Sequence, residues 1–365
     1  MHADSAVGSA TDPGNLFICI KITGITMSDV LKVGDAIAKS GEIKKGHIKG
    51  IELNNGLSLD VPVLIANGKE NGPTLLLSST EHGTEIQGIW IILEVLNKRL
   101  DARKLRGNVI GIPVMNPMAF FVGRYRSWID HLDYRVRADN PEGNAMETLC
   151  HNLWAEAVSK ADAWINMHCN VRPDALLFSI IDTTDPRNRD KNIEMARALG
   201  YTTIYNTDKP IRDQTPLSYR VMAAKKGTPY VTIEYIDGRN ISEPSTSTGV
   251  RGILNVMKTL DMIDGEIEPH TEELTIVPGV NKSVGMIRTR RGGLVRFKKN
   301  PGEPIKKGDT VAEVYNLFGS LIEKVEMPVD GYIWAFPSGS FDDTSGVLQT
   351  VNTGCGLAYA FVHEK

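Results

Sequence analysis

A histidine and a carboxylate, three residues apart, stand where a short apolar run gives way to a helical pattern. The run occupies residues 74–78 (TLLLS), and His82 and Glu85 follow it in the segment STEHGTE. Side chains at this spacing, at a strand-to-helix junction, can both point at one ion. Imidazole and carboxylate are suitable zinc ligands. On its own, however, the pair is more typical of a helix N-terminus at which Glu85 serves the dipole and His82 caps or packs.

His168 strengthens the metal interpretation. It directly follows a second apolar run, residues 163–167 (AWINM). In open α/β sheets, ligands collect beyond the carboxyl ends of the strands, so both candidates fall at the same edge of one sheet. A lone histidine there is usually a satisfied polar residue, but two histidines and one glutamate form a catalytic zinc set with a fourth position left for water. We therefore predict one zinc ion per chain, held by His82, Glu85 and His168.

Glu234 ends a third apolar run, residues 230–233 (YVTI). A carboxylate in this position is costly unless it is paired or takes part in chemistry. Beside a metal, it can take a proton from water and then give it to a leaving nitrogen. The competing interpretation is a salt bridge to Arg239 or Arg251.

The segment 116–137 is rich in arginine and begins at Asn116. Arginine side chains suit a carboxylate, or the oxyanion of a tetrahedral intermediate. The candidates for these roles are Arg124, Arg126, Arg135 and Arg137. The competing interpretation is a solvated loop with local ion pairs, which would account for some of them.

The elements that position these residues alternate between strand and helix. Such alternation predicts an α/β domain with a largely parallel sheet flanked by helices, which we assign to residues 71–263. Buried strands are predicted at residues 74–78, 107–114, 163–167, 175–181 and 230–235, and helices at residues 83–100, 144–160, 192–199 and 217–226.

The flanking segments are rich in short strands. Residues 1–70 are predicted to form a β-rich N-terminal appendage, with a short helix over residues 27–40. Residues 274–365 contain many glycines and tight turns without a helical period, which predicts a small all-β C-terminal domain. We interpret that domain as a structural cap that restricts access to small substrates and could join subunits into a homo-oligomer.

The composition narrows the range of partners. A net charge of −3 argues against nucleic acid as the main partner. No stretch approaches the roughly 18 consecutive apolar residues of a membrane helix, and the N-terminus has no features of a signal peptide. The 4 cysteines form no CxxC pair, which is typical of reduced thiols. We expect a cytoplasmic protein that acts on a small molecule and binds neither nucleic acid nor membrane.

The order of these motifs resembles the succinylglutamate desuccinylase/aspartoacylase family, which belongs with the zinc carboxypeptidases in fold. The resemblance runs over residues 74–234: HxxE after a strand, IPxxNP at residues 112–117, the arginine-rich loop, and strands ending in His and Glu. It implies a zinc-carboxypeptidase-like sheet with a β-rich tail. It also implies metal ligation by His82, Glu85 and His168, acid/base catalysis by Glu234, oxyanion stabilisation by Arg124 and carboxylate binding by Arg135.

Two departures from the family pattern concern the substrate and the metal. Residues 132–135 read LDYR where the family usually reads DLNR, so that Tyr134 replaces a substrate-binding asparagine. Residues 166–168 read NMH where the family reads DLH, so that Asn166 replaces an aspartate that would support a metal ligand. Metal and fold are compatible with both changes, but the substrates of the named family members are not carried over.

Together these features predict a zinc-dependent amidohydrolase that cleaves the C–N amide bond of a small carboxylate-bearing molecule, such as an N-acyl amino acid. Tyr134 and Asn116 are expected to contact the substrate, as is Arg126, which is close enough to Arg124 to take its role instead. One alternative is a metal-dependent deaminase, esterase or carboxypeptidase-like hydrolase. A metal-free binding module is a second alternative, disfavoured because all the ligand candidates and Glu234 are present.

Overall fold

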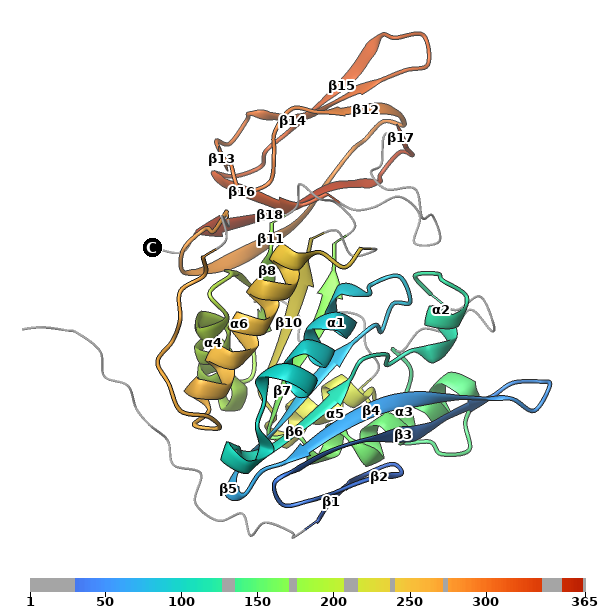
Figure 1. Ribbon diagram of the computed structural model, residues 1–365. Coiled ribbons are helices and arrows are strands. Elements are labelled where there is room, and N and C mark those ends of the chain that lie inside the picture. The colour runs from blue at the N-terminus through green and yellow to red at the C-terminus, as the bar shows by residue number, and fades with distance from the viewer. Residues whose placement is uncertain are drawn as a thin grey trace, which may run out of the picture.

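A computed structural model describes residues 30–126, 135–170, 176–206, 216–236, 240–271, 275–336 and 350–363. A large mixed sheet forms the centre, helices cover its faces, and a smaller sheet lies at one end of the molecule (Figure 1). The predicted α/β class, with β-rich segments at both ends, is confirmed. The boundaries placed between the three predicted domains stay predictions.

The large sheet has the strand order β13-β16-β18-β11-β9-β8-β10-β7-β5-β6-β4-β3. Neighbouring strands from β11 to β6 are parallel except for the β8–β10 pair, and the outer strands pair antiparallel. Its strands are β3 (Glu42–Glu52), β4 (Ser58–Asn67), β5 (Glu70–Ser79), β6 (Arg106–Ile112), β7 (Ala163–Cys169), β8 (Phe178–Asp182), β9 (Thr202–Asn206), β10 (Tyr230–Tyr235), β11 (Val280–Arg288), β13 (Pro304–Ile305), β16 (Gly331–Ala335) and β18 (Gly356–His363).

Helices bury both faces of this sheet, which explains the continuous apolar run in β5. Leu75 and Leu77 belong to the core beneath α1, α4 and α6, whereas Leu76 belongs to the core beneath α3 and α5. Alternate residues of a strand point to opposite faces, so a strand covered on both sides has no polar face. The helices are α1 (Gln87–Glu94), α2 (Pro117–Phe121), α3 (Ala145–Glu156), α4 (Pro186–Leu199), α5 (Tyr219–Lys226) and α6 (Glu243–Thr259), with single turns at η1 (Val95–Arg99), η2 (Ala102–Lys104) and η3 (Val158–Lys160).

The helix predicted over residues 27–40 is wrong over its described part. Residues 30–39 form the hairpin of β1 (Val30–Val33) and β2 (Ala36–Lys39). Gly34 turns the chain with a φ of 58°, and a side chain there would collide with the backbone carbonyl of His47. Burial alternates with a period of two along β2, which is the pattern of a strand.

The C-terminal segment is all β in its described part and joins the large sheet directly. Strand β11 pairs in parallel with β9, so β11, β18, β16 and β13 extend the large sheet. The smaller sheet has the order β15-β14-β12-β17, with β12 (Gly293–Phe297), β14 (Thr310–Tyr315), β15 (Leu321–Glu326) and β17 (Thr350–Val351). Among the described residues, no helix is both long and apolar enough to cross a membrane.

Candidate metal centre

The loop between β5 and α1 carries two of the predicted ligands and is held in a constrained conformation. Thr80 has a φ of 57°, a region that β-branched residues rarely adopt. Its hydroxyl donates to the carbonyl of Glu85 at 2.9 Å, and its carbonyl accepts from the backbone N–H of Asn116 at 3.0 Å. These bonds attach the loop to the start of α2 and fix the path of the chain between His82 and Glu85.

Gly83 allows a second segment to lie directly against this loop. A Cβ at this position would lie 2.5 Å from the carbonyl oxygen of Arg124, and closer still to the backbone of Ala119. The backbone N–H of Gly83 donates to the carbonyl of Tyr125 at 3.2 Å. The absence of a side chain therefore brings residues 119–125 onto the segment that bears His82.

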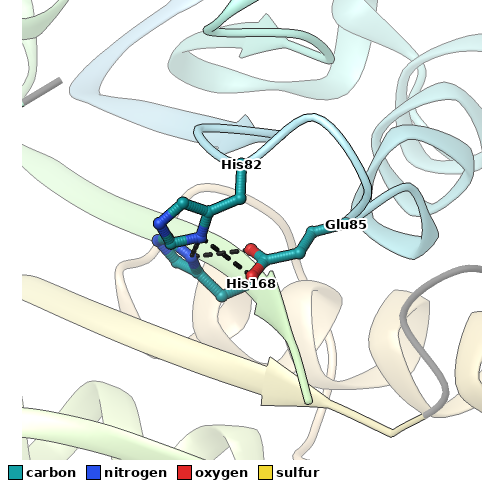
Figure 2. Close-up of side chains that lie close together, drawn as sticks. All are labelled: His82, Glu85 and His168. Atoms are coloured by element: carbon teal, nitrogen blue, oxygen red, sulfur yellow. Dashed lines mark hydrogen bonds and ion pairs between the residues drawn. The ribbon is translucent and has the colours of Figure 1, made fainter. Parts of the chain in front are cut away.

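The side chains of His82, Glu85 and His168 converge on one point (Figure 2). Nδ1 of His82 lies 2.8 Å from one carboxylate oxygen of Glu85, Nδ1 of His168 lies 2.8 Å from the other, and the two nitrogens are 3.2 Å apart. All three residues are buried. Ligand atoms around a tetrahedral zinc, with bonds of about 2.0–2.1 Å, lie roughly 3.3 Å from one another. The spacing and the donor types both fit, so these residues could hold a zinc ion.

The electrostatics of the cluster also favour a cation. Burial raises the pKa of Glu85, but His82 and His168 outweigh it and lower that pKa to about 2. Burial lowers the pKa of His168, but Glu85 and Glu81 outweigh it and raise that pKa to about 10. The carboxylates thus stay ionised and stabilise positive charge on His168, and a metal ion bound to His168 would take the place of that proton.

Glu234 lies beside this cluster. It pairs in register with His168 across the parallel strands β10 and β7, so both side chains lie on the same face of the sheet near its carboxyl edge. Burial raises the pKa of Glu234 to about 8, against the opposing effect of His168. None of the ion pairs within the described ranges includes Glu234, while Arg239, one of the two proposed salt-bridge partners, lies outside them.

Part of the arginine-rich segment lies over the metal centre. The ring of Tyr125 stacks on the ring of His82, with centroids 3.7 Å apart and planes 16° from parallel. Arg124 is exposed, and the half-buried Arg126 has its guanidinium carbon 5.9 Å from the centre of the Tyr125 ring. Both arginines are sequence neighbours of Tyr125, whose ring covers His82, and Arg126 lies near that ring. Arg135 is half-buried, and the predicted residue Tyr134 lies outside the described residues.

Asn116, predicted to contact substrate, connects two parts of the site. Its side-chain oxygen accepts from the N–H of Ala119 at 3.0 Å and caps α2. Its side-chain nitrogen donates to the carbonyl of Glu81 at 3.2 Å. In this structure the amide group thus holds α2 against the loop that carries His82.

A buried polar network behind His168 is absent from the sequence-based prediction. The Glu81 carboxylate accepts from the hydroxyl of Tyr219 at 2.5 Å and forms an ion pair with Arg220. Its other contact is Nε2 of His168, 3.1 Å from Oε2. Burial raises the pKa of Glu81, but Arg220 and His168 outweigh it and hold that pKa well below its usual range. Glu81 adjoins His82 in the sequence and could have been found there, whereas the start of α5 carries no local signal.

Comparison with known proteins places the chain among amide-bond hydrolases by sequence. The family model described as the succinylglutamate desuccinylase/aspartoacylase catalytic domain matches residues 71–260, which include the three converging residues and Glu234. The N-alpha-acetyl-L-2,4-diaminobutyric acid deacetylase of Halomonas elongata is 26% identical over 308 residues, covering 81% of this chain and 87% of that protein.

Solved structures with a similar fold cover most of the chain. A succinylglutamate desuccinylase/aspartoacylase from Rhodobacter sphaeroides has a TM-score of 0.72 and 20% identity, and the match covers 88% of this chain and 96% of that one. The product-bound ectoine utilization protein EutE (DoeB) from Ruegeria pomeroyi has a TM-score of 0.72 and 19% identity, and the match covers 93% of this chain and 100% of that one. At these identities the similarity establishes a common fold.

Proposed function

Because the chain belongs to the succinylglutamate desuccinylase/aspartoacylase family, we propose that it is a zinc-dependent amidohydrolase that cleaves the C–N amide bond of a small N-acyl amino acid. The observation that carries this proposal is the convergence of His82, Glu85 and His168 beside Glu234 at one sheet edge. The deacetylase relative, named for an N-acetylated amino acid, supports the substrate class.

His82, Glu85 and His168 would hold the metal through two imidazole nitrogens and a carboxylate. Zinc bound there supplies Lewis acidity toward the amide carbonyl and lowers the pKa of water from about 15.7 toward about 7. Burial of all three side chains keeps the ligand set dry and strengthens its attraction for a divalent cation.

Glu234 is proposed as the acid/base. It takes a proton from the attacking water and gives that proton to the departing nitrogen. A pKa raised to about 8 by burial suits both tasks, because the carboxyl group can hold a proton and release it near neutral pH. The register with His168 places Glu234 next to the proposed metal ligands.

The arginines are proposed to recognise charge on the substrate. Arg124 would stabilise the oxyanion of the tetrahedral intermediate, with Arg126 as the alternative, since both are adjacent in sequence to Tyr125, whose ring covers His82. Arg135 would bind the substrate carboxylate through a bidentate contact. The substrate contacts predicted for Tyr134 and Asn116 remain part of the proposal.

The test is a turnover assay on zinc-loaded protein with two matched sets of amides. One set consists of N-acetyl and other N-acyl amino acids, and the other of the same amides without the α-carboxylate. We expect the wild type to hydrolyse the first set and to lose turnover on the second. The Arg135→Met variant should show the same loss of turnover on the first set. No hydrolysis of any member by protein that holds zinc would contradict the proposed reaction. Equal rates on both sets would contradict the carboxylate clamp.

A further inference from the structure

We propose that Glu81 is a positioning residue that fixes the orientation and proton location of the His168 ring, and thereby sets the affinity of the metal site. The inference rests on the proposed function, because it takes His168 as a metal ligand. It adds a residue that contacts the ligand from the side away from the metal, and it names the interaction through which that residue acts.

The two ring nitrogens of His168 face different surroundings. Nδ1 points into the cluster, 2.8 Å from Glu85 and 3.2 Å from Nδ1 of His82. A neutral imidazole carries its proton on only one nitrogen. For Nδ1 to present a lone pair to a metal, the proton must lie on Nε2, where it needs a hydrogen-bond acceptor.

In the part of the chain that the structure describes, one of the polar groups close to Nε2 can serve as that acceptor. Three polar atoms lie close to it: Oε2 of Glu81 at 3.1 Å, Nδ2 of Asn166 at 2.9 Å and Nη2 of Arg220 at 3.0 Å. A guanidinium has donors and no acceptor. The Asn166 amide presents its nitrogen, because its oxygen accepts from the hydroxyl of Ser78 at 2.7 Å. Of these three groups, Glu81 alone can accept the Nε2 proton that the metal-binding tautomer requires.

Glu81 is itself held in place from several sides. Glu81 is only 1% exposed. Its carboxylate accepts a hydrogen bond from the Tyr219 hydroxyl and forms an ion pair with the Arg220 guanidinium. Its backbone carbonyl accepts from the amide of Asn116. Pairing with Arg220 offsets the cost of a buried carboxylate. The Glu81 carboxylate is thus already fixed in the metal-free protein. The entropy cost of ordering the His168 ring on metal binding is therefore small.

The experiment measures zinc affinity rather than activity. Metal-free wild type and Glu81→Gln would be titrated with zinc in competition with a chromophoric chelator. Loss of a partner that orients a ligand typically weakens metal binding about 10–100-fold, and we expect a loss in this range with the zinc stoichiometry unchanged. Glu323→Gln is the matched control, because Glu323 is a half-buried glutamate paired with Arg290 in the distant C-terminal sheet.

A rescue variant separates positioning from general damage. Asn166→Asp places a carboxylate within reach of Nε2 of His168, because the Asn166 side chain already lies 2.9 Å from it. In the Glu81→Gln background, this change should recover most of the lost affinity. The visible absorption of the cobalt-substituted proteins should change in Glu81→Gln and return toward wild type in the double variant, a response that a merely structural role would not give.

The outcomes distinguish this inference from the proposed function. Wild-type zinc binding with unchanged affinity in Glu81→Gln overturns the inference alone. Failure of the wild type to bind zinc overturns both. Glu81→Gln could prevent folding by leaving the charge of Arg220 without its partner. In that case the double variant Glu81→Gln/Arg220→Gln, which removes both charges, is used in place of the single variant. The same loss of zinc affinity is expected. Affinity equal to wild type in that double variant overturns the inference.

Discussion

Replacing Gly83 by alanine should disable the site without touching a proposed ligand. The new Cβ would lie 2.5 Å from the carbonyl oxygen of Arg124, and closer still to the backbone of Ala119. Favourable nonbonded contacts of carbon begin at roughly 3.5 Å, so the two segments must separate by about 1 Å. The loop bearing His82 is bonded at Thr80 to both Glu85 and Asn116, so we expect the segment around Arg124 to move.

The expected magnitude follows from that displacement. A misplacement of about 1 Å in a group that contacts the reacting atoms can lower kcat/KM about 100-fold. Overpacking of this kind costs roughly 1–3 kcal/mol of unfolding free energy. The measurements are steady-state kinetics on the zinc-loaded protein and chemical denaturation. Gly292→Ala is a matched control, because its Cβ would meet its nearest neighbour at 3.1 Å, far from the site. Unchanged kinetics and stability in Gly83→Ala would refute the close approach.

Three further predictions concern charged residues of the site. Glu234→Gln should lower kcat by about 10²–10⁴-fold, the range for loss of a general acid/base, while elemental analysis finds its zinc content unchanged; loss of zinc would contradict the assigned role. Burial raises the pKa of Glu234 above its ordinary 4.5, and the base form is needed for proton removal, so kcat/KM should fall as pH decreases through that raised pKa; an acid limb at or below the ordinary value would contradict the assignment. Arg220→Met should lower the unfolding free energy by about 3–5 kcal/mol, measured by urea denaturation, because it leaves the Glu81 carboxylate buried without its cation; a loss below about 1 kcal/mol, the size of a surface ion pair, would show that the charge needs no such partner.

The position of the site could be predicted because three apolar runs in the sequence each end at or near a candidate site residue. Each of the apolar runs before His82, before His168 and through Glu234 is a central strand buried on both faces. Strands β5, β7 and β10 are parallel neighbours, so their carboxyl ends meet at one edge. A polar residue at the end of such a strand is conspicuous in the sequence, and its neighbours follow from the topology.

Helix α6 was not predicted, because its sequence has little helical character. It begins with EPSTST and contains Gly249 and Gly252, and most of these residue types have low helix propensity. Tertiary packing accounts for the helix instead. A side chain at Gly249 would lie 2.8 Å from the Tyr235 hydroxyl, and one at Gly252 would lie 2.5 Å from the Tyr201 hydroxyl. The glycines let α6 approach the sheet closely. The packing that results stabilises the helix, and helix propensity, which depends on local sequence alone, does not include it.

The network around Glu81 was missed for a related reason. Its partners Tyr219 and Arg220 are 138 and 139 residues away along the chain, so no local spacing connects them to Glu81. The start of α5 reaches the site only because α5 packs, with α3, on the same face of the sheet. The hairpin at residues 30–39 was misassigned because its short apolar pattern fits a helix as well as a strand, and only the turn at Gly34 decides between them.

The most direct test of the metal centre is elemental analysis of the purified protein beside the His82→Ala variant, after both have been supplied with zinc. We expect about one zinc per chain in the wild type, as for a single three-residue site, and loss of that zinc in the variant. Equal zinc in the two proteins would contradict the assignment of His82. A wild type that retains no zinc would contradict the metal centre, and with it the proposed hydrolysis.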